Sequence, residues 1–203
     1  MSPAQVLERT YATLKERLLS GLYAPGYRLE AVRLADDLSV SMTPVRDVLN
    51  RLTGERLVHA VAGDGFYVPV MTEDALRDLL TWNAHLLDQA VRRRPRAERV
   101  GRGLPAAGSD LADRTGILFL MMARDTDSAE FEQAVASVND RLHVVRRREL
   151  LVLRQAEAEL QGLEQAYRNE SARDLARQLR SYHARRLRQV SSLLRRPREG
   201  GEA

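Results

Sequence analysis

Side chains that can bind nucleic acid are concentrated in one short stretch of the sequence. Ser41 and Thr43 carry hydroxyls there, and Arg46 carries a guanidinium group. Asn50 lies one helical turn beyond Arg46 on the same face, and Arg51 adds a second guanidinium group. Hydroxyls and the free amides of a helix start favour phosphate, and an arginine can fork onto guanine O6 and N7. The combination predicts hydrogen bonds to phosphates and base edges.

Residues for catalysis form no comparable group. The sequence has four histidines and no cysteine, which excludes a thiol nucleophile, a disulfide and a cysteine-based zinc site. It has no nucleophile–base constellation, no glycine loop of the kind that cradles phosphate and no strong metal motif. We therefore predict that the protein is not an enzyme.

The predicted contact residues need a rigid support, which the hydrophobic pattern provides. Apolar side chains recur at helical spacing in three segments: residues 5–21, 30–38 and 43–56. Pro25-Gly26 ends the first helix, and Arg28-Leu29 after it is long enough for only a very short strand. Thr43 is the expected N-cap of the third helix, because Pro44 then occupies the first helical position, where its missing N–H costs nothing.

A hairpin is predicted directly after these helices. Two β-rich runs, 57–61 and 66–70, flank the sequence Ala-Gly-Asp-Gly, which is typical of a tight turn. Gly63 and Gly65 let the hairpin tip approach a minor groove closely, whereas Asp64 would repel phosphate. Two helices, a turn, a third helix and a hairpin form the layout of a winged helix-turn-helix.

This part of the chain also contains an ordered set of motifs. Leu18-Leu19, Gly21 and Pro25-Gly26 come first, and the others follow in order: Leu34-Ala35, Leu38, Val40-Ser41, Thr43-Pro44-Val45-Arg46, Val48-Leu49, Arg51-Leu52, Leu57-Val58 and Gly65-Phe66-Tyr67-Val68. The set covers about the first third of the chain and resembles the DNA-binding domain of GntR-type regulators. The resemblance implies a mostly α fold in which residues 1–71 form a winged helix-turn-helix, made of three helices and a β-hairpin wing.

From the residues and the resemblance together we predict the following DNA contacts: Arg33, Ser41, Met42, Thr43, Arg46, Asn50, Arg51, Gly63 and Gly65. Some of these side chains have alternative roles. Arg46 could pair with Glu30 or Asp47 instead, and Arg33 and Arg51 could be solvated surface.

Two positions depart from the family pattern. Met42 stands where the family usually has an arginine that reads bases, and Arg56 replaces the glycine usual after the recognition helix. Losing a bidentate donor typically forfeits roughly 1–3 kcal/mol of discrimination between bases. The operator sequence therefore cannot be inferred from relatives.

From Thr72 onward the pattern is helical throughout. Five helices are predicted: 73–93, 110–124, 128–150, 151–169 and 172–195. The segment 92–108 is rich in Arg, Gly and Pro and is an expected exposed connection, and residues 197–203 are an expected flexible tail. Pairs at i,i+4 such as Glu164–Arg168 are typical of solvated helix faces.

Three segments of this region, Thr72–Leu79, Asn139–His143 and Ala172–His183, resemble the effector domain of the FadR-type branch of the same family, known as FCD. The resemblance implies that residues 72–196 form an all-α antiparallel bundle that binds an effector and forms dimers. It also implies a site in which one Asp and three His hold a divalent metal.

Only part of that site is present in this sequence. His143 and His183 fall on matching positions, Asn139 replaces the Asp, and Leu160 or Glu159 stands at the middle histidine. Two imidazoles with one amide make a poor site for a transition metal. We therefore expect no metal and no other cofactor. If a divalent metal binds, His143 and His183 would hold it.

A different register would bring Asp140 or Glu159 into that site as a substitute ligand, and otherwise the two histidines are polar residues that face a pocket or the surface. Asn83 and Leu87 stand where the family has an arginine and a glutamate. A pocket for a small apolar or aromatic effector is still predicted, with these lining residues: Trp82, Asn83, Asn139, His143 and His183, together with Phe119, Met121, Met122 and Tyr182. Apolar residues at helical spacing more often form a plain core.

Overall charge does not support the nucleic-acid hypothesis. The formal net charge is +4, but residues 141–203 hold 15 basic against 8 acidic side chains, whereas residues 1–75 hold 8 against 10. No run of eighteen apolar residues exists, and the N-terminus lacks the apolar block of a secretory signal. We expect a cytoplasmic protein that does not interact with membranes.

These patterns predict a sequence-specific DNA-binding transcriptional regulator that acts as a repressor under the control of a small-molecule effector. Its expected partner is a double-stranded DNA operator, bound as a homodimer because two half-sites mirror a two-fold protein. The alternative is a regulator-derived protein-interaction or dimerisation module that has lost ligand sensing, since three effector-domain positions differ from the family.

Overall fold

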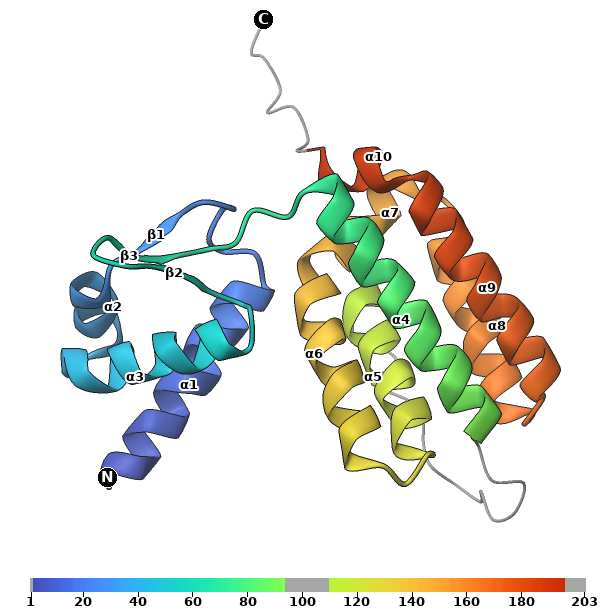
Figure 1. Ribbon diagram of the computed structural model, residues 1–203, viewed down its shortest axis with the longest axis horizontal. Coiled ribbons are helices and arrows are strands. Elements are labelled where there is room, and N and C mark those ends of the chain that lie inside the picture. The colour runs from blue at the N-terminus through green and yellow to red at the C-terminus, as the bar shows by residue number, and fades with distance from the viewer. Residues whose placement is uncertain (1, 94–109, 196–203) are drawn as a thin grey trace, which may run out of the picture. The chain divides into compact units, whose positions relative to one another are not determined.

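The computed structural model divides the chain into two compact units, Met1–Met71 and Thr72–Ala203. It describes residues 2–93 and 110–195 (Figure 1). Most of the predicted connection 92–108 and all of the predicted tail 197–203 lie outside the described residues. Helices dominate both units, so the predicted mostly α class is confirmed.

Three helices form most of the first unit: α1 (Pro3–Leu19), α2 (Ala31–Leu38) and α3 (Met42–Gly54). A capping box starts α1, because the Ser2 hydroxyl accepts from the Gln5 N–H while the Gln5 side chain accepts from the Ser2 N–H. One apolar stripe of each helix enters a shared core with these members: Leu14, Leu18, Leu34, Ala35, Val45, Val48, Leu49 and Leu52. The period of 3.6 residues that predicted the helices is therefore also what closes the core.

The start of α3 differs from the prediction. Ser41 is the N-cap, with an extended backbone at φ −75° and ψ 163°, and Met42 and Thr43 are already helical. Pro44 thus sits at the third helical position rather than the first. Any of the first helical N–H groups lacks a partner within the helix, so a proline fits in the first turn without losing a hydrogen bond.

A small antiparallel sheet completes the unit. Its strands are β1 (Arg28–Leu29), β2 (His59–Val61) and β3 (Gly65–Tyr67), in the order β1-β3-β2. The predicted hairpin and the predicted short strand are both confirmed. The strands of the hairpin are shorter than predicted, because Leu57 and Val58 instead enter the core below α3.

The second unit is a bundle of helices: α4 (Glu73–Arg93), α5 (Leu111–Arg124), α6 (Ala129–Arg146), α7 (Glu149–Val152), α8 (Ala156–Arg168), α9 (Ala172–Arg188) and α10 (Val190–Leu194). α4 lies at the centre and packs against α5, α6 and α9 (Figure 1). α8 packs against α9, and α5 packs closely against α6. Within the described ranges, no helix combines the length and the apolar character needed to cross a membrane.

Two predicted helices of the bundle are broken. The predicted helix 128–150 ends at Arg146, and the short α7 follows it. The predicted helix 172–195 is interrupted at Gln189, where φ is −110°. The first break allows Glu149, which is only 2% exposed, to enter the bundle and meet a buried arginine. Tertiary pairing of charges overrides local helix propensity here.

Candidate nucleic-acid interface

The outer face of α3 presents polar side chains to solvent. Val45, Val48, Leu49 and Leu52 of this helix are at most 1% exposed. The opposite face carries the predicted contact residues, all exposed: Ser41, Met42, Thr43, Arg46 and Asn50. The Ser41 hydroxyl makes no capping hydrogen bond, so it points to no backbone partner within the helix. The first-turn N–H groups and this hydroxyl together suit a phosphate oxygen.

Arg46 is the unpaired cation of this face. Within residues 2–93 and 110–195 its side chain makes no ion pair and no hydrogen bond. The alternative pairing with Glu30 is excluded in this structure, because that carboxylate lies 3.0 Å from Arg33 Nε. Arg33 itself is 72% exposed on α2, where a weak surface pair leaves it able to exchange its partner.

Arg51 makes contacts within the first unit. Its Nη1 lies 2.8 Å from Glu8 Oε1 of α1, and its guanidinium group stacks 3.6 Å above the Tyr11 ring. The Tyr11 hydroxyl in turn donates to Glu55 at 2.8 Å. These contacts fasten the end of α3 to α1. The Arg51 side chain is still 45% exposed, so its contact with DNA stays a prediction.

The wing tip is less acidic than the sequence indicated. Arg28 Nη2 lies 3.5 Å from Asp64 Oδ1 and donates to the Asp64 carbonyl oxygen at 2.5 Å. The Tyr67 hydroxyl also donates to Asp64 Oδ2 at 2.7 Å. Gly63 and Gly65 have φ of 77° and 128°, which residues with a Cβ rarely adopt. Sequence reasoning missed Arg28, although its position opposite Tyr67 across β1 and β3 explains its reach.

Arg56 has a left-handed backbone with φ of 60°, directly after α3. An arginine in this region is strained by contact of its Cβ with the backbone, and glycine is not. This conformation gives a physical reason why glycine suits the position.

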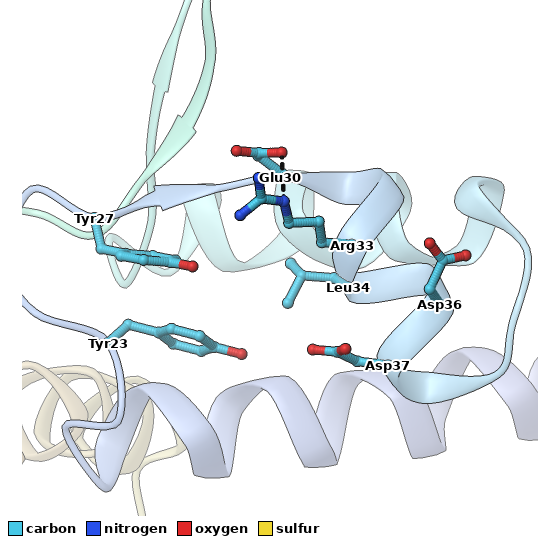
Figure 2. Close-up of a pocket in the computed structure, with 7 residues that line it drawn as sticks. All are labelled: Tyr23, Tyr27, Glu30, Arg33, Leu34, Asp36 and Asp37. Carbon is cyan, nitrogen blue, oxygen red and sulfur yellow. Dashed lines mark ion pairs between the residues drawn. The ribbon is translucent and has the colours of Figure 1, made fainter.

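The first unit also contains a cavity of about 220 Å³ that the sequence did not indicate (Figure 2). Its walls are Tyr23, Tyr27, Glu30, Arg33, Leu34, Asp36 and Asp37. The rings of Tyr23 and Tyr27 stack at 5.4 Å on one side, and carboxylates line the other. Three carboxylates against the one guanidinium group of Arg33 make the interior of this cavity unsuited to phosphate.

The predicted effector residues of the bundle lie in different environments. Trp82 is 51% exposed on α4, so its side chain is not part of the buried core of the bundle. Asn83, one residue later, is fully buried and its Nδ2 lies 3.1 Å from His183 Nε2. Asn139 donates to the Gly116 carbonyl oxygen at 2.8 Å. His143 lies near the surface, with Nε2 3.8 Å from Asp113 Oδ1.

His183 is fully engaged by protein groups. Its Nδ1 donates to the Leu179 carbonyl oxygen at 2.8 Å, which leaves Nε2 as the acceptor from Asn83. Burial lowers the pKa of His183 to about 4, and burial also lowers the pKa of His143. Both rings are therefore neutral at pH 7. No group of three or more His, Cys, Asp or Glu side chains within the described residues is arranged to hold a metal ion.

The apolar residues named for the pocket lie in the core. Phe119 and Tyr182 meet edge to face at 5.4 Å, and the Tyr182 ring meets His183 at 5.0 Å. Met121 and Met122 are 8% and 2% exposed. The sequence left open whether these four side chains line an effector pocket or form a plain core. Their burial fits the plain core.

Comparison with known proteins finds a family whose model matches the first unit. The model of the family described as "Bacterial regulatory proteins, gntR family" matches residues 7–68. The Nta operon transcriptional regulator of Aminobacter aminovorans is 43% identical over 70 residues, which are 34% of this chain and 33% of that protein. The HTH-type transcriptional regulator BphR of Paraburkholderia xenovorans LB400 is 33% identical over 87 residues, 43% of this chain and 36% of its own. The chain therefore matches about a third of the length of these curated relatives.

Solved structures resemble the chain over nearly its whole length. Escherichia coli McbR/YncC has a TM-score of 0.67 at 15% identity, covering 96% of this chain and 100% of that one. The crystal structure of a putative GntR transcriptional regulator from Rhodococcus sp. RHA1 has a TM-score of 0.71 at 18% identity, covering 92% and 97%. At these identities the likeness establishes the fold of both units.

Proposed function

We propose that the protein is a sequence-specific DNA-binding transcriptional regulator, because residues 7–68 match the model of the gntR family of bacterial regulatory proteins. The observation that supports this proposal best is the outer face of α3. It exposes Arg46 without a partner of its own, beside the hydroxyls of Ser41 and Thr43. A recognition helix presents the residues of its first turns to the major groove, where an arginine can pair with guanine or phosphate.

The wing supports the same surface. Arg28 holds Asp64 at the tip and reduces the repulsion between this carboxylate and a phosphate backbone. Gly63 is exposed and has no side chain that would keep the tip away from a groove. We assign the wing a role in approaching the minor groove, while α3 reads the major groove.

Control by a small-molecule effector belongs to the second unit in this proposal. The regulator acts as a repressor, binds a two-fold operator as a homodimer and works in the cytoplasm. The FCD-like segments of the bundle support an effector function for it. Metal plays no part in it, because both ring nitrogens of His183 already have protein partners.

The test is DNA binding by the full chain to the region upstream of its own gene, measured at two salt concentrations. Arg46→Ala should weaken binding by roughly 10- to 100-fold, because a good arginine contact contributes about 1–3 kcal/mol. Arg180→Ala is the matched control, since Arg180 is equally exposed but belongs to α9 of the other unit. It removes the same charge and should leave the affinity unchanged. If both variants lose the same affinity for DNA, the binding is explained by non-specific electrostatic attraction alone, and Arg46 has no specific contact.

A protein-interaction module without DNA recognition remains the second candidate. It is favoured by the full engagement of His183, since this residue then needs no ligand. Under this alternative, the affinity for DNA would depend neither on the DNA sequence nor on the Arg46→Ala substitution.

A further inference from the structure

Among the residues of the helical bundle that the structure describes, two arginines are buried, and one of these two forms ion pairs. Arg186 of α9 is 1% exposed and Arg146 at the end of α6 is 2% exposed. A buried charge is costly unless an opposite charge and hydrogen bonds compensate for it. Comparing the two side chains therefore shows what each still lacks.

Arg186 is compensated on every side. Its Nε donates to Glu149 Oε1 at 2.9 Å and its Nη2 donates to Glu149 Oε2 at 2.5 Å, so one carboxylate binds both ends of the same guanidinium edge. Its Nη1 donates to Glu159 Oε2 at 2.8 Å and to the Tyr182 carbonyl oxygen at 3.1 Å. This two-point geometry is the strong form of an arginine–carboxylate pair.

Arg146 has almost none of these contacts. Its Nη1 donates to Asn139 Oδ1 at 2.9 Å, but Nε and Nη2 have no hydrogen-bond partner. Within residues 2–93 and 110–195 it forms no ion pair. The two unpaired atoms are the same edge, Nε with Nη2, that holds the Glu149 carboxylate in Arg186.

No carboxylate within the described residues forms an ion pair with Arg146. The guanidinium group lies 5.1 Å from the Phe119 ring centroid and next to Gly116, where a Cβ would come within 3.8 Å of Nη1. Burial raises the pKa of Tyr182, whereas the charge of Arg186 and the charge and hydrogen bonding of Arg146 oppose the shift. This phenol is therefore neutral and gives Arg146 a polar neighbour without a counter-charge. The Oδ1 atom of Asn83, buried on α4 against His183, also has no hydrogen-bond partner.

We propose that the bundle binds a small molecule through a carboxylate group, held on the Nε and Nη2 edge of Arg146. A planar carboxylate fits this edge because Glu149 fits the same edge of Arg186. It adds a single negative charge, which neutralises the buried guanidinium group. The free acceptor on Asn83 suits a hydrogen-bond donor elsewhere on the ligand. The proposal deepens the effector control proposed above and rests on it for its biological meaning. Binding itself is measurable without DNA.

The first experiment measures the melting temperature of the full chain with formate, acetate or benzoate, each compared with its uncharged amide. At ten times the Kd, the carboxylate that fits should raise the melting temperature by roughly 3–6 °C, and its amide should not. Sulfate and phosphate are added separately, because a shift with these ions alone would indicate a site for tetrahedral anions and overturn the carboxylate assignment.

The paired variants are Arg146→Met and Arg147→Met. Arg146→Met replaces the buried charge with an apolar chain of similar length, and it should abolish the response to carboxylate. Arg147 follows directly but is 43% exposed and pairs with Asp110, so Arg147→Met should retain the response. Equal responses in the two variants would place the effect on the protein surface and overturn the proposal.

A second measurement on the unmodified protein does not depend on the folding of any variant. In a sample with ¹⁵N-labelled arginine, the buried Nε–H signals of Arg146 and Arg186 exchange slowly with water. Arg186 provides the reference for a carboxylate-bonded Nε–H. Added carboxylate should move the Arg146 signal toward it. Each carboxylate is added at a 50-fold molar excess over the protein. If the Arg146 signal stays unchanged with all three carboxylates, the proposal is overturned. This conclusion does not depend on the outcome of the DNA-binding test.

Discussion

The two units of this chain place their charged side chains in opposite ways. The winged-helix unit keeps its arginines at the surface, and Thr10 is the one polar residue of its described part that is buried. The helical bundle buries Arg146, Glu149, Glu164 and Arg186 among its apolar residues. If the proposed functions hold, DNA would bind on the exterior of the first unit with little reorganisation. An effector of the second unit would bind inside the protein, where each charge has a large effect on stability.

Among the tests of this contrast, the largest effect is expected for Arg186→Met. The substitution leaves Glu149 buried without its counter-ion, and we expect the free energy of unfolding to fall by about 3–5 kcal/mol. Urea unfolding followed by circular dichroism measures it. Arg51→Met is the matched change in the winged-helix unit, where an exposed pair with Glu8 and a stacked Tyr11 are lost. Its effect should be several-fold smaller. Comparable losses in the two variants would contradict the contrast.

The second test uses pH. His183 is neutral in the folded state with a pKa of about 4, whereas the unfolded chain has an ordinary histidine pKa near 6.5. Below pH 6.5 the unfolded chain therefore takes up a proton that the folded protein does not. The free energy of unfolding should fall by about 3 kcal/mol between pH 6.5 and pH 4, with roughly 2 kcal/mol lost by pH 5.

The variant His183→Gln removes this titration and keeps a polar side chain next to Asn83. Its stability, measured by urea unfolding at pH 7, 6 and 5, should depend less on pH than that of the unmodified protein. Two parallel pH profiles would show that His183 does not titrate in this way. His143, which lies near the surface, is present in both proteins, so its titration cancels from the comparison.

The smallest effect is expected for a substitution in the winged-helix unit. Arg56→Gly relieves the left-handed backbone at φ 60° after α3, and we expect the melting temperature to rise, with a gain of about 0.5–1 kcal/mol. The gain is limited because glycine also gives the unfolded chain more freedom. Arg56→Ala removes the same side chain without relieving the backbone, and it should give no gain. If the melting temperature rises in both variants, the effect comes from removing the Arg56 charge and not from the backbone.

The sequence predicted the winged-helix unit better than the bundle for a physical reason. In the first unit, helix period, turn residues and the Gly-Asp-Gly tip are all local signals, and they located each element. The start of α3 was misplaced because Ser41 and Thr43 can both cap a helix and a proline fits anywhere in the first turn.

In the bundle, the decisive contacts join distant parts of the chain. Arg186 meets Glu149 across 37 residues, and Arg114 meets Glu164 across 50. Such pairs depend on how helices pack against one another, which the spacing of residues along the chain does not contain. The break before Glu149 accompanies one of these pairs, because it lets the Glu149 carboxylate meet Arg186. The exposure of Trp82 was missed because an aromatic residue on an amphipathic helix usually faces the core.

Met42, 43% exposed at the start of α3, has a consequence for how DNA binding would respond to ionic strength. A thioether displaces no condensed cations from a phosphate backbone, whereas an arginine at the same place would displace about one. An apolar side chain in the major groove instead favours the methyl group of thymine. If α3 reads DNA as proposed, each half-site should tolerate salt better than that of a relative with arginine there, and it should be sensitive to replacing thymine by uracil.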